Sequence, residues 1–362
     1  GESTQWAKQK NYDLIFWNLP YLEVDEDAEL LGPLEDAALI ETQGKDLFGL
    51  VLKKIHQHQL LSNTGIGLFL VGESKSTERL VNTAAKSGFA CRVIDDETFD
   101  DGEEIKIIAV WRPFVNAKKI HQTSLTSTST ELLSSNWPIG SSLSSDHQTD
   151  GHGRRGRRWD NSGEVLACSW KIGNTFDISP NILQLICGVI VKQCLQQHNQ
   201  SPGSIQIIQK WPNDILLKQD GQIGKVCGVL IESISKGNVN ETVIGIGINL
   251  SKLENMPVYD IPASFAESLD KEISRMILQS EIDCRLAGLF DEAPNIPKAN
   301  LTAYHRLASK SITDGFIAPS KLIYRNYEVS FDSVNVDGFV IVRDQKNQLL
   351  LCDEGESLKW EF

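Results

Sequence analysis

A short basic loop carries the strongest chemical signal in this chain. Residues 151–158 read GHGRRGRR, so that three glycines and four arginines precede Trp159 directly. Glycine lets a backbone approach a ligand closely, and the planar arginine fork matches the oxygens of phosphate and carboxylate groups. A tryptophan face suits stacking on a nucleotide base. The loop indicates a cover over a nucleotide phosphate, and a solvated basic loop or a nucleic-acid contact is the alternative interpretation.

Three further motifs follow the loop along the chain. Lys210–Asp214 reads KWPND, Gly224–Gly228 reads GKVCG, and Gly245–Asn249 reads GIGIN. Each is weak alone, because Pro-Asn-Asp is a common turn and Gly-x-Gly occurs in many proteins. In this order and spacing after the basic loop, they are specific in combination. The loop is not a P-loop, since the sequence has no G-x-x-x-x-G-K-[ST] motif.

These motifs need strands and helices to position them, and the hydrophobic pattern predicts such a framework. Apolar runs and helical spacing predict five strands and one helix: Val165–Ile172, Ile205–Ile208, Asp214–Lys218, Cys227–Ile234, Thr242–Leu250 and helix Asn181–His198. Residues 122–146 are rich in Ser and Thr, which is typical of a linker. Their apolar anchors, such as Leu132 and Trp137, instead favour the ordered start of this domain. From Ile317 to Phe362, short β segments around a turn at Asp337–Gly338 predict a small barrel.

The first 115 residues have a different pattern, in which strands alternate with helices. The predicted elements are strands Tyr12–Trp17, Gly65–Val71, Ala90–Ile94 and Ile105–Trp111, and helices Gly44–His58 and Ser76–Ala85. Such alternation predicts parallel α/β layers. We therefore expect three domains, at residues 1–116, 117–312 and 313–362.

Composition narrows the classes of partner. The net charge is −13 and the pI is near 5.1, so the chain as a whole is repelled by nucleic acid and anionic lipid. The seven cysteines are scattered without a C-x-x-C pair, which predicts buried free thiols in a reducing, cytoplasmic compartment. We see no signal peptide and no apolar run of about 18 residues that could span a membrane. A chain that starts at Gly1 without a methionine is expected to be a processed product or a fragment.

Residues from about 122 to 362 resemble biotin protein ligases, the family of bacterial biotin–carboxyl-carrier ligases and eukaryotic holocarboxylase synthetases. The matching pieces are Ser127–Thr128, Gln148–Thr149, the GHGRRGRRW loop, KWPNDI, GKVCGVL and GIGIN. The resemblance implies an α+β catalytic domain with a class II synthetase-like sheet and a small SH3-like C-terminal domain. It also implies ATP, Mg²⁺ and biotin as reactants, biotinyl-5′-AMP as intermediate, and a lysine of a biotin carboxyl carrier protein as acceptor.

The resemblance implies roles for the residues that match the family's motifs. Those implied for biotin binding are Ser127, Thr128, Gln148, Gly151, His152 and Gly228. Those implied for nucleotide binding are Arg154, Arg157, Trp159, Lys210, Asn213 and Asn249. In the implied catalytic set, Arg154 and Lys225 neutralise the biotin carboxylate and the α-phosphate, and Asp214 orients the incoming amine or takes its proton. No residue is implied as a metal ligand.

Structural roles are the alternative at single positions, and the chain departs from the family at others. Ser127 and Thr128 could cap a helix that reaches Glu131. The loop usually reads Gly-Arg-Gly-Arg, whereas His152 here replaces the first arginine, and Ser129 replaces an asparagine. Thr126 likewise stands where the family commonly has an aspartate. Because histidine is mostly neutral near pH 7, we expect a weaker cationic contact and the same reaction class.

The N-terminal region resembles the second half of a class I methyltransferase of the Asn-Pro-Pro-Tyr type. Asp13–Tyr21 reads DLIFWNLPY, in which Asn18 and Tyr21 match the residues that hold the methylated nitrogen and Leu19 replaces the first proline. The glycine-rich loop that binds S-adenosylmethionine should precede Asn18 and is not found there. We therefore expect no methyl transfer, and a scaffold or carrier-protein contact instead.

Other function classes stay open. A lipoate or octanoate ligase and a non-catalytic biotin-binding module share the ligase fold, and a homodimer is compatible with the sequence. A DNA-binding regulator is disfavoured, because residues 1–120 carry 13 basic and 20 acidic side chains.

Overall fold

The protein is described from a computed structural model, in which the chain forms two compact units. The first unit comprises Gly1–Asn116 and Ser280–Ala299, and the second comprises Ala117–Gln279 and Asn300–Phe362. The described residues are 11–19, 46–72, 76–100, 102–159, 163–173, 178–236, 239–251, 261–292 and 296–362. Residues 280–299 lie within the range predicted for the second domain, yet they group with the first unit.

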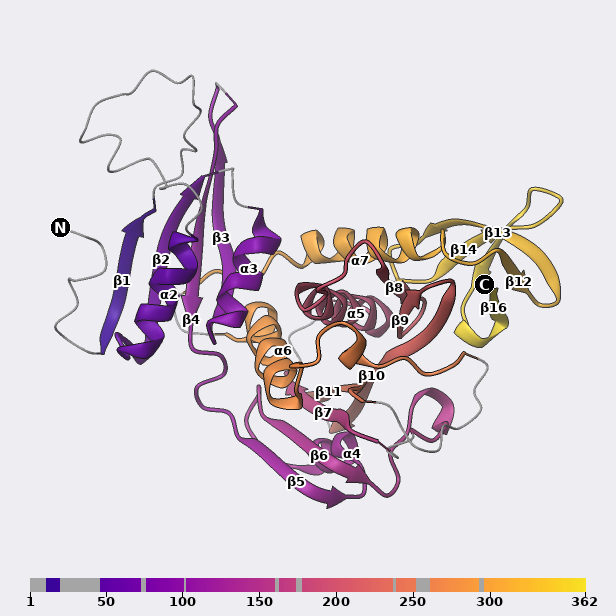
Figure 1. The fold of residues 1–362 in the computed structure, drawn as a ribbon, viewed down its shortest axis with the longest axis horizontal. Coiled ribbons are helices and arrows are strands. Elements are labelled where there is room, and N and C mark those ends of the chain that lie inside the picture. The colour runs from indigo at the N-terminus through magenta and orange to yellow at the C-terminus, as the bar shows by residue number, and fades with distance from the viewer. Residues whose placement is uncertain are drawn as a thin grey trace. The chain divides into compact units, whose positions relative to one another are not determined.

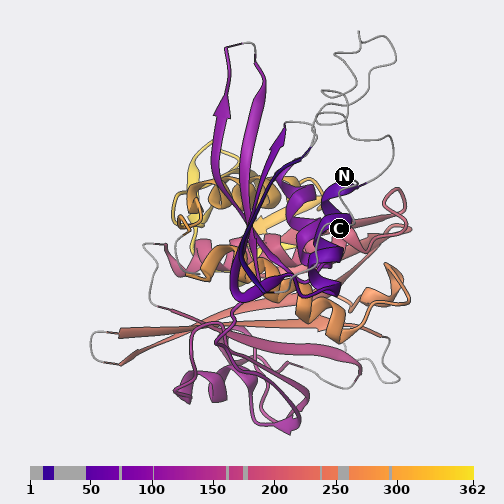
Figure 2. The same cartoon turned by 90° about the vertical axis from the view of Figure 1, so that its left-hand side faces the viewer.

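The first unit is a four-stranded sheet with two helices on one face (Figures 1 and 2). Its elements are β1 (Tyr12–Asn18), α2 (Leu47–Gln57), β2 (Leu61–Gly72), α3 (Thr77–Lys86), β3 (Ala90–Thr98) and β4 (Glu104–Trp111). Asp46 and Ser76 cap the two helices by accepting from backbone N–H groups in the first turn. Phe48 and Phe69 meet edge to face, with ring centroids 5.5 Å apart, in the core between helices and sheet.

The prediction of a parallel sheet in this unit is wrong for two of its three strand pairs. The strands lie in the order β1-β2-β4-β3, and β1 pairs with β2 in parallel, but β4 is antiparallel to both β2 and β3. The link from Thr98 to Glu104 is too short for the crossover that parallel strands require, so β3 and β4 form a hairpin. The sequence pattern located the strands but carried no information on their direction.

A buried arginine anchors residues 280–299, the segment that returns to the first unit. Arg92, on β3, donates to three backbone oxygens: Nε to Gly288 at 2.8 Å, and its terminal nitrogens to Pro297 at 2.6 Å and Asp291 at 2.9 Å. The Asp291 carboxylate accepts from Trp111 Nε1 at 3.0 Å. Because charge-assisted bonds to a buried group are strong, this segment is an integral part of the unit.

The second unit is built on a seven-stranded sheet in the order β5-β6-β7-β11-β10-β9-β8 (Figure 1). Its strands are β5 (Lys119–Leu125), β6 (Ser142–Gln148), β7 (Val165–Ile172), β8 (Ile205–Lys210), β9 (Asp214–Gln219), β10 (Gln222–Lys236) and β11 (Val239–Asn249). Only the β5–β6 pair among these is parallel. The largely antiparallel sheet agrees with the α+β expectation.

Helices cover this sheet, and a polar side chain caps the first turn of three of them: Ser127, Ser179 and Asn300. The helices are α4 (Thr128–Ser134), α5 (Pro180–Gln197) and α7 (Leu301–Gly315), while α6 (Arg275–Phe290) runs from the second unit into the first. Ser179 caps α5 and Pro180 occupies its first turn, where no N–H is needed. The Ser/Thr-rich segment 122–146 contains the end of β5, α4 and the start of β6, so it is ordered as predicted, although its two strands were missed.

The C-terminal residues of the second unit form a five-stranded antiparallel sheet. Its strands are β12 (Lys321–Tyr324), β13 (Tyr327–Val334), β14 (Val340–Arg343), β15 (Leu349–Cys352) and β16 (Leu358–Glu361), in the order β15-β14-β13-β12-β16. Trp211 Nε1, between β8 and β9, donates to Gly338 O at 3.0 Å. Gly355 lies so close to Pro212 that an added Cβ would be 2.5 Å from the ring. The C-terminal sheet therefore packs closely against the β8–β9 turn.

Two further expectations concern the whole chain. All seven cysteines are buried and free of disulfides, as predicted. In the part of the chain that the structure describes, no helix is long and apolar enough to cross a membrane.

Candidate active site

A buried hydrogen-bonded row links the start of α4 to the end of β6. Ser127 caps α4, as the structural alternative proposed. Gln148 Oε1 accepts from the backbone N–H of Thr128 at 2.7 Å and from its hydroxyl at 3.0 Å. Three of the residues implied for biotin binding are therefore brought together at one helix N-terminus.

The row continues through two serines that the sequence interpretation did not place in the site. Thr128 Oγ1 lies 2.8 Å from Ser169 Oγ on β7, and Ser169 Oγ lies 2.9 Å from Ser129 Oγ. Gly245, on β11, allows the Ser129 hydroxyl to approach the strand closely, since an added Cβ would be 2.8 Å from Ser129 Oγ. Four polar side chains, those of Gln148, Thr128, Ser169 and Ser129, thus form one continuous buried row.

A lysine–aspartate pair forms the second part of the site. Lys225 Nζ lies 2.7 Å from Asp214 Oδ1. Asp214 is the first residue of β9 and stands opposite Gly228 in the β9–β10 register, which is shifted between Lys225 and Cys227. The side chain of Asp214 is largely buried, whereas that of Lys225 is more accessible. Such a pair combines a cation that can bind an anionic group with a carboxylate that can take part in proton transfer.

Trp159 lies flat on two glycines beside this pair. A Cβ added to Gly247 would be 2.5 to 2.9 Å from the indole ring, and one added to Gly228 would be 3.3 Å from it. Lys225 Nζ lies 5.6 Å from the ring centroid, within range of a cation–π contact. The two glycines are therefore needed for the close approach of the indole.

The glycines of β11 join the two parts. Gly245 faces Ser129 and Gly247 faces Trp159, and residues two apart in a strand point to the same face. The hydroxyl row and the Lys225–Asp214–Trp159 cluster consequently lie next to one another on one face of the sheet. A ligand that spans both would place one polar end on the row and an anionic group at Lys225.

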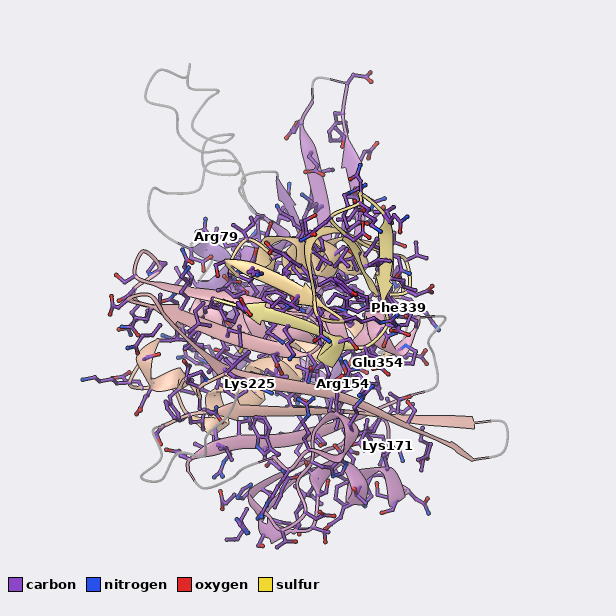
Figure 3. All side chains as sticks on the ribbon, turned by 90° about the vertical axis from the view of Figure 1, so that its right-hand side faces the viewer. Arg79, Arg154, Lys171, Lys225, Phe339 and Glu354 are labelled. Carbon is purple, nitrogen blue, oxygen red and sulfur yellow. The ribbon has the colours of Figure 1, made fainter. Side chains whose placement is uncertain are left out.

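Acidic residues in the connection between β15 and β16 pair with two arginines of the basic loop. Arg155 pairs with Glu354 at 2.6 Å and with Glu356 at 3.7 Å, and Arg157 pairs with Glu356 at 3.1 Å. Arg155 has a φ of 56°, so the loop turns sharply there. Arg154, which is half-buried, and Glu354 are labelled with Lys225 in Figure 3. Since salt bridges between exposed groups are weak, a nucleotide phosphate can compete for Arg157.

The imidazole of His152 forms hydrogen bonds within the protein through both of its ring nitrogens. Its Nε2 lies 3.1 Å from Glu232 Oε1 on β10, and its Nδ1 lies 3.2 Å from Asp150 O. The hydrogen bond to Glu232 raises the pKa of His152, with a smaller opposing effect of burial. The histidine therefore anchors the start of the loop to the sheet.

Three more of the residues predicted for nucleotide binding lie around the Lys225–Asp214–Trp159 cluster: Asn249, Asn213 and Lys210. Asn249 Nδ2 donates to Lys225 O at 3.1 Å, which steadies the backbone of the lysine. Asn213 accepts through its backbone oxygen from Val229 N at 2.9 Å. Lys210 Nζ lies 5.6 Å from the Trp360 ring centroid, and burial lowers the pKa of this lysine against the opposing charge of Asp214.

Comparison with known proteins shows a family to which this sheet is similar. Residues 119–249 match the model of the biotin/lipoate A/B protein ligase family. The match covers β5 to β11 and every predicted site residue, so the matched region contains both parts of the candidate site.

Curated relatives and a solved structure show the same similarity. The ligase/repressor BirA of Bacillus subtilis is 28% identical over 212 residues, which is 57% of either chain. BirA of Escherichia coli is 28% identical over 233 residues, 61% of this chain and 64% of that one. The chain thus spans less than two thirds of either relative. The apo biotin protein ligase of Aquifex aeolicus shares the fold at 18% identity and a TM-score of 0.51, covering 67% of this chain and 99% of that one.

Sequence reasoning missed several residues of the candidate site. Ser169 lies within a predicted, largely apolar strand, and a polar residue buried in such a strand needs a hydrogen-bond partner. Glu232 gave no such signal, since it lies in an ordinary strand sequence. Glu354 and Glu356 are about 200 residues from the loop, and no local pattern links them to it.

Proposed function

We propose that this chain is a biotin protein ligase that activates biotin with ATP and transfers it to a lysine of a biotin carboxyl carrier protein. The observation that carries the proposal is the Lys225–Asp214 pair at 2.7 Å, beside Trp159 and next to the Thr128–Gln148 row. This arrangement offers polar partners for a ureido ring, a cation for the reacting anions and an aromatic face for adenine.

In the proposed first step, a biotin carboxylate oxygen attacks the α-phosphorus of ATP and pyrophosphate leaves. Both reacting groups are anionic, so their approach requires compensating positive charge. Lys225 provides it from β10, and Arg154 and Arg157 provide it from the loop, once the phosphates displace Glu356 from Arg157. The loop would also exclude water from the mixed anhydride.

In the proposed second step, the carrier lysine attacks the acyl carbon and AMP leaves. The amine must be neutral to attack, and it loses a proton as the amide forms. Asp214 suits this task, because its carboxylate is held beside the reaction centre by Lys225. Lys225 then remains to stabilise the departing phosphate.

Mg²⁺ is expected to enter with the nucleotide. Among the described residues, no group of three or more His, Cys, Asp or Glu side chains could hold a metal ion. We treat the ion as part of the substrate, coordinated by the phosphate oxygens.

Biotin-dependent exchange between pyrophosphate and ATP tests the proposal, because exchange requires the first step alone. We expect exchange with biotin. Exchange with lipoate or octanoate but not with biotin would transfer the assignment to the lipoate branch of the family, and tight biotin binding without exchange would leave a non-catalytic module.

Replacing His152 with arginine is expected to leave exchange equal or higher at pH 8. Because its pKa is raised, His152 stays charged to a higher pH than an ordinary histidine does. It loses the charge as the pH rises through the raised pKa. Arginine keeps its charge throughout and can still reach Glu232. The difference in exchange rate between His152→Arg and the unmodified chain should narrow towards pH 6. A large loss of exchange in the variant at both pH 6 and pH 8 would show that the imidazole itself is required.

We propose a supporting role for the first unit and a separate C-terminal module. We propose domain boundaries at residues 1–116, 117–312 and 313–362, and an SH3-like fold for the last of these domains. For the methyltransferase-like segment, Asn18 ends β1, whereas Tyr21 lies outside the described residues. We infer no methyl transfer, and tight binding of S-adenosylmethionine would contradict this. We also infer no DNA-binding role, and retention on DNA at physiological salt would contradict it.

A further inference from the structure

The buried hydroxyl row has a fixed direction of hydrogen bonding. Each hydroxyl has one proton. Thr128 uses its proton on Gln148 Oε1, which can only accept. Ser169 must therefore donate to Thr128, and Ser129 must donate to Ser169. All three protons point along the row towards Gln148, so what Thr128 and Ser129 can offer a ligand is lone pairs.

We propose that Ser169 is a positioning residue that, through Thr128 and Ser129, tunes the candidate site to accept the N–H groups of a cyclic urea. The proposal rests on the proposed function and deepens it, since it names a determinant of substrate choice on β7. A ring that carries N–H donors satisfies the outward lone pairs of the row. An apolar ring, such as a dithiolane, leaves those lone pairs without a donor, which is costly in a buried site.

The surroundings of Ser169 support this role. It is fully buried, in a strand whose eight residues are all buried. A hydroxyl at such a position is unfavourable unless it is hydrogen-bonded, and Ser169 bonds two partners on α4. Gly245 is the nearest residue of β11, where a Cβ would be 2.8 Å from Ser129 Oγ and 3.6 Å from Ser169 Oγ.

The test is Ser169→Ala in the full chain, assayed by pyrophosphate exchange. Alanine removes the donor to Thr128 and the acceptor for Ser129, so the Ser129 proton is no longer held along the row. We expect the KM for biotin to rise about tenfold with kcat unchanged. Desthiobiotin, which keeps the cyclic urea without the sulfur ring, should lose the same factor. The KM for ATP should not change.

A double-mutant cycle separates positioning from simple loss of packing. Thr128→Val removes the hydroxyl through which Ser169 would act, so Ser169→Ala should add less than a twofold effect in that background. Ser142→Ala is the matched control. Ser142 is a buried serine of β6 opposite Trp170, and its Oγ has no hydrogen-bond partner among the described residues. This variant should leave both KM values unchanged.

Less than a twofold change in the KM for biotin in Ser169→Ala, or full additivity with Thr128→Val, would overturn the positioning role. A parallel rise in the KM for ATP would also overturn it, because it would show general damage to the site. Absence of biotin-dependent exchange in the unmodified chain would instead contradict the proposed function.

Discussion

Replacing Lys225 with methionine is expected to lower kcat for pyrophosphate exchange by about a thousandfold. In the proposed reaction the ammonium neutralises the two reacting anions, and removing one such charge-stabilising group typically costs a hundred- to a thousandfold in kcat, about 2.7–4 kcal/mol. Methionine keeps most of the aliphatic stem that lies beside Trp159. The measurement is kcat and KM for biotin and ATP, in which the loss should fall mainly on kcat.

Two further variants make this result interpretable. Lys218→Met is the matched control, because Lys218 lies on the adjacent strand β9 and takes no part in the site. It should retain full activity. Since Lys225→Met leaves Asp214 without its cation, the double variant with Asp214→Asn restores charge balance and should recover stability without activity. Retention of more than a tenth of normal kcat in Lys225→Met would remove the lysine from the catalytic set.

Replacing Gly247 with alanine is expected to raise the KM for ATP by ten- to a hundredfold. The new methyl group would be 2.5 Å from the nearest atom of the Trp159 ring, so the indole must move from the sheet. Loss of stacking on one base typically costs about 1–3 kcal/mol, which corresponds to this range. The KM for biotin should change less, because the hydroxyl row lies nearer Gly245.

Gly203→Ala is the control for this substitution. Gly203 precedes β8, and an added Cβ there would have no atom within 4 Å. Trp159→Ala should reproduce the loss seen in Gly247→Ala, and the double variant should be no worse than either single one. Independent, additive losses would show that Gly247 acts on the nucleotide without Trp159.

Local sequence predicted the elements and motifs of this protein well. Val165–Ile172 is a strand with the predicted bounds, because a continuous apolar run between turn signals has few other solutions. The strands around Ser127 and Gln148 were missed, since β5 and β6 contain Ser, His, Thr and Gln at positions that the sheet nevertheless orders. Tertiary hydrogen bonds, such as those of Thr128 and Ser169, outweigh the local preference there.

Long-range partners could not be read from the sequence. Lys225 and Asp214 stood in neighbouring motifs, and the antiparallel register brought them to 2.7 Å. His152 pairs with Glu232 across 80 positions, and Arg157 pairs with Glu356 across a still longer separation. Periodicity describes one element at a time, so the residues that orient the loop become visible once the sheets are assembled.

The returning segment at residues 280–299 has a consequence for synthesis in the cell. Arg92 finds its carbonyl partners at Gly288, Asp291 and Pro297. Because chains emerge from the ribosome N-terminus first and domains generally fold in that order, the first unit begins early and waits for these residues. By then residues 119–249 have already been made. The first unit therefore can be completed only after the region that matches the ligase family has been synthesised.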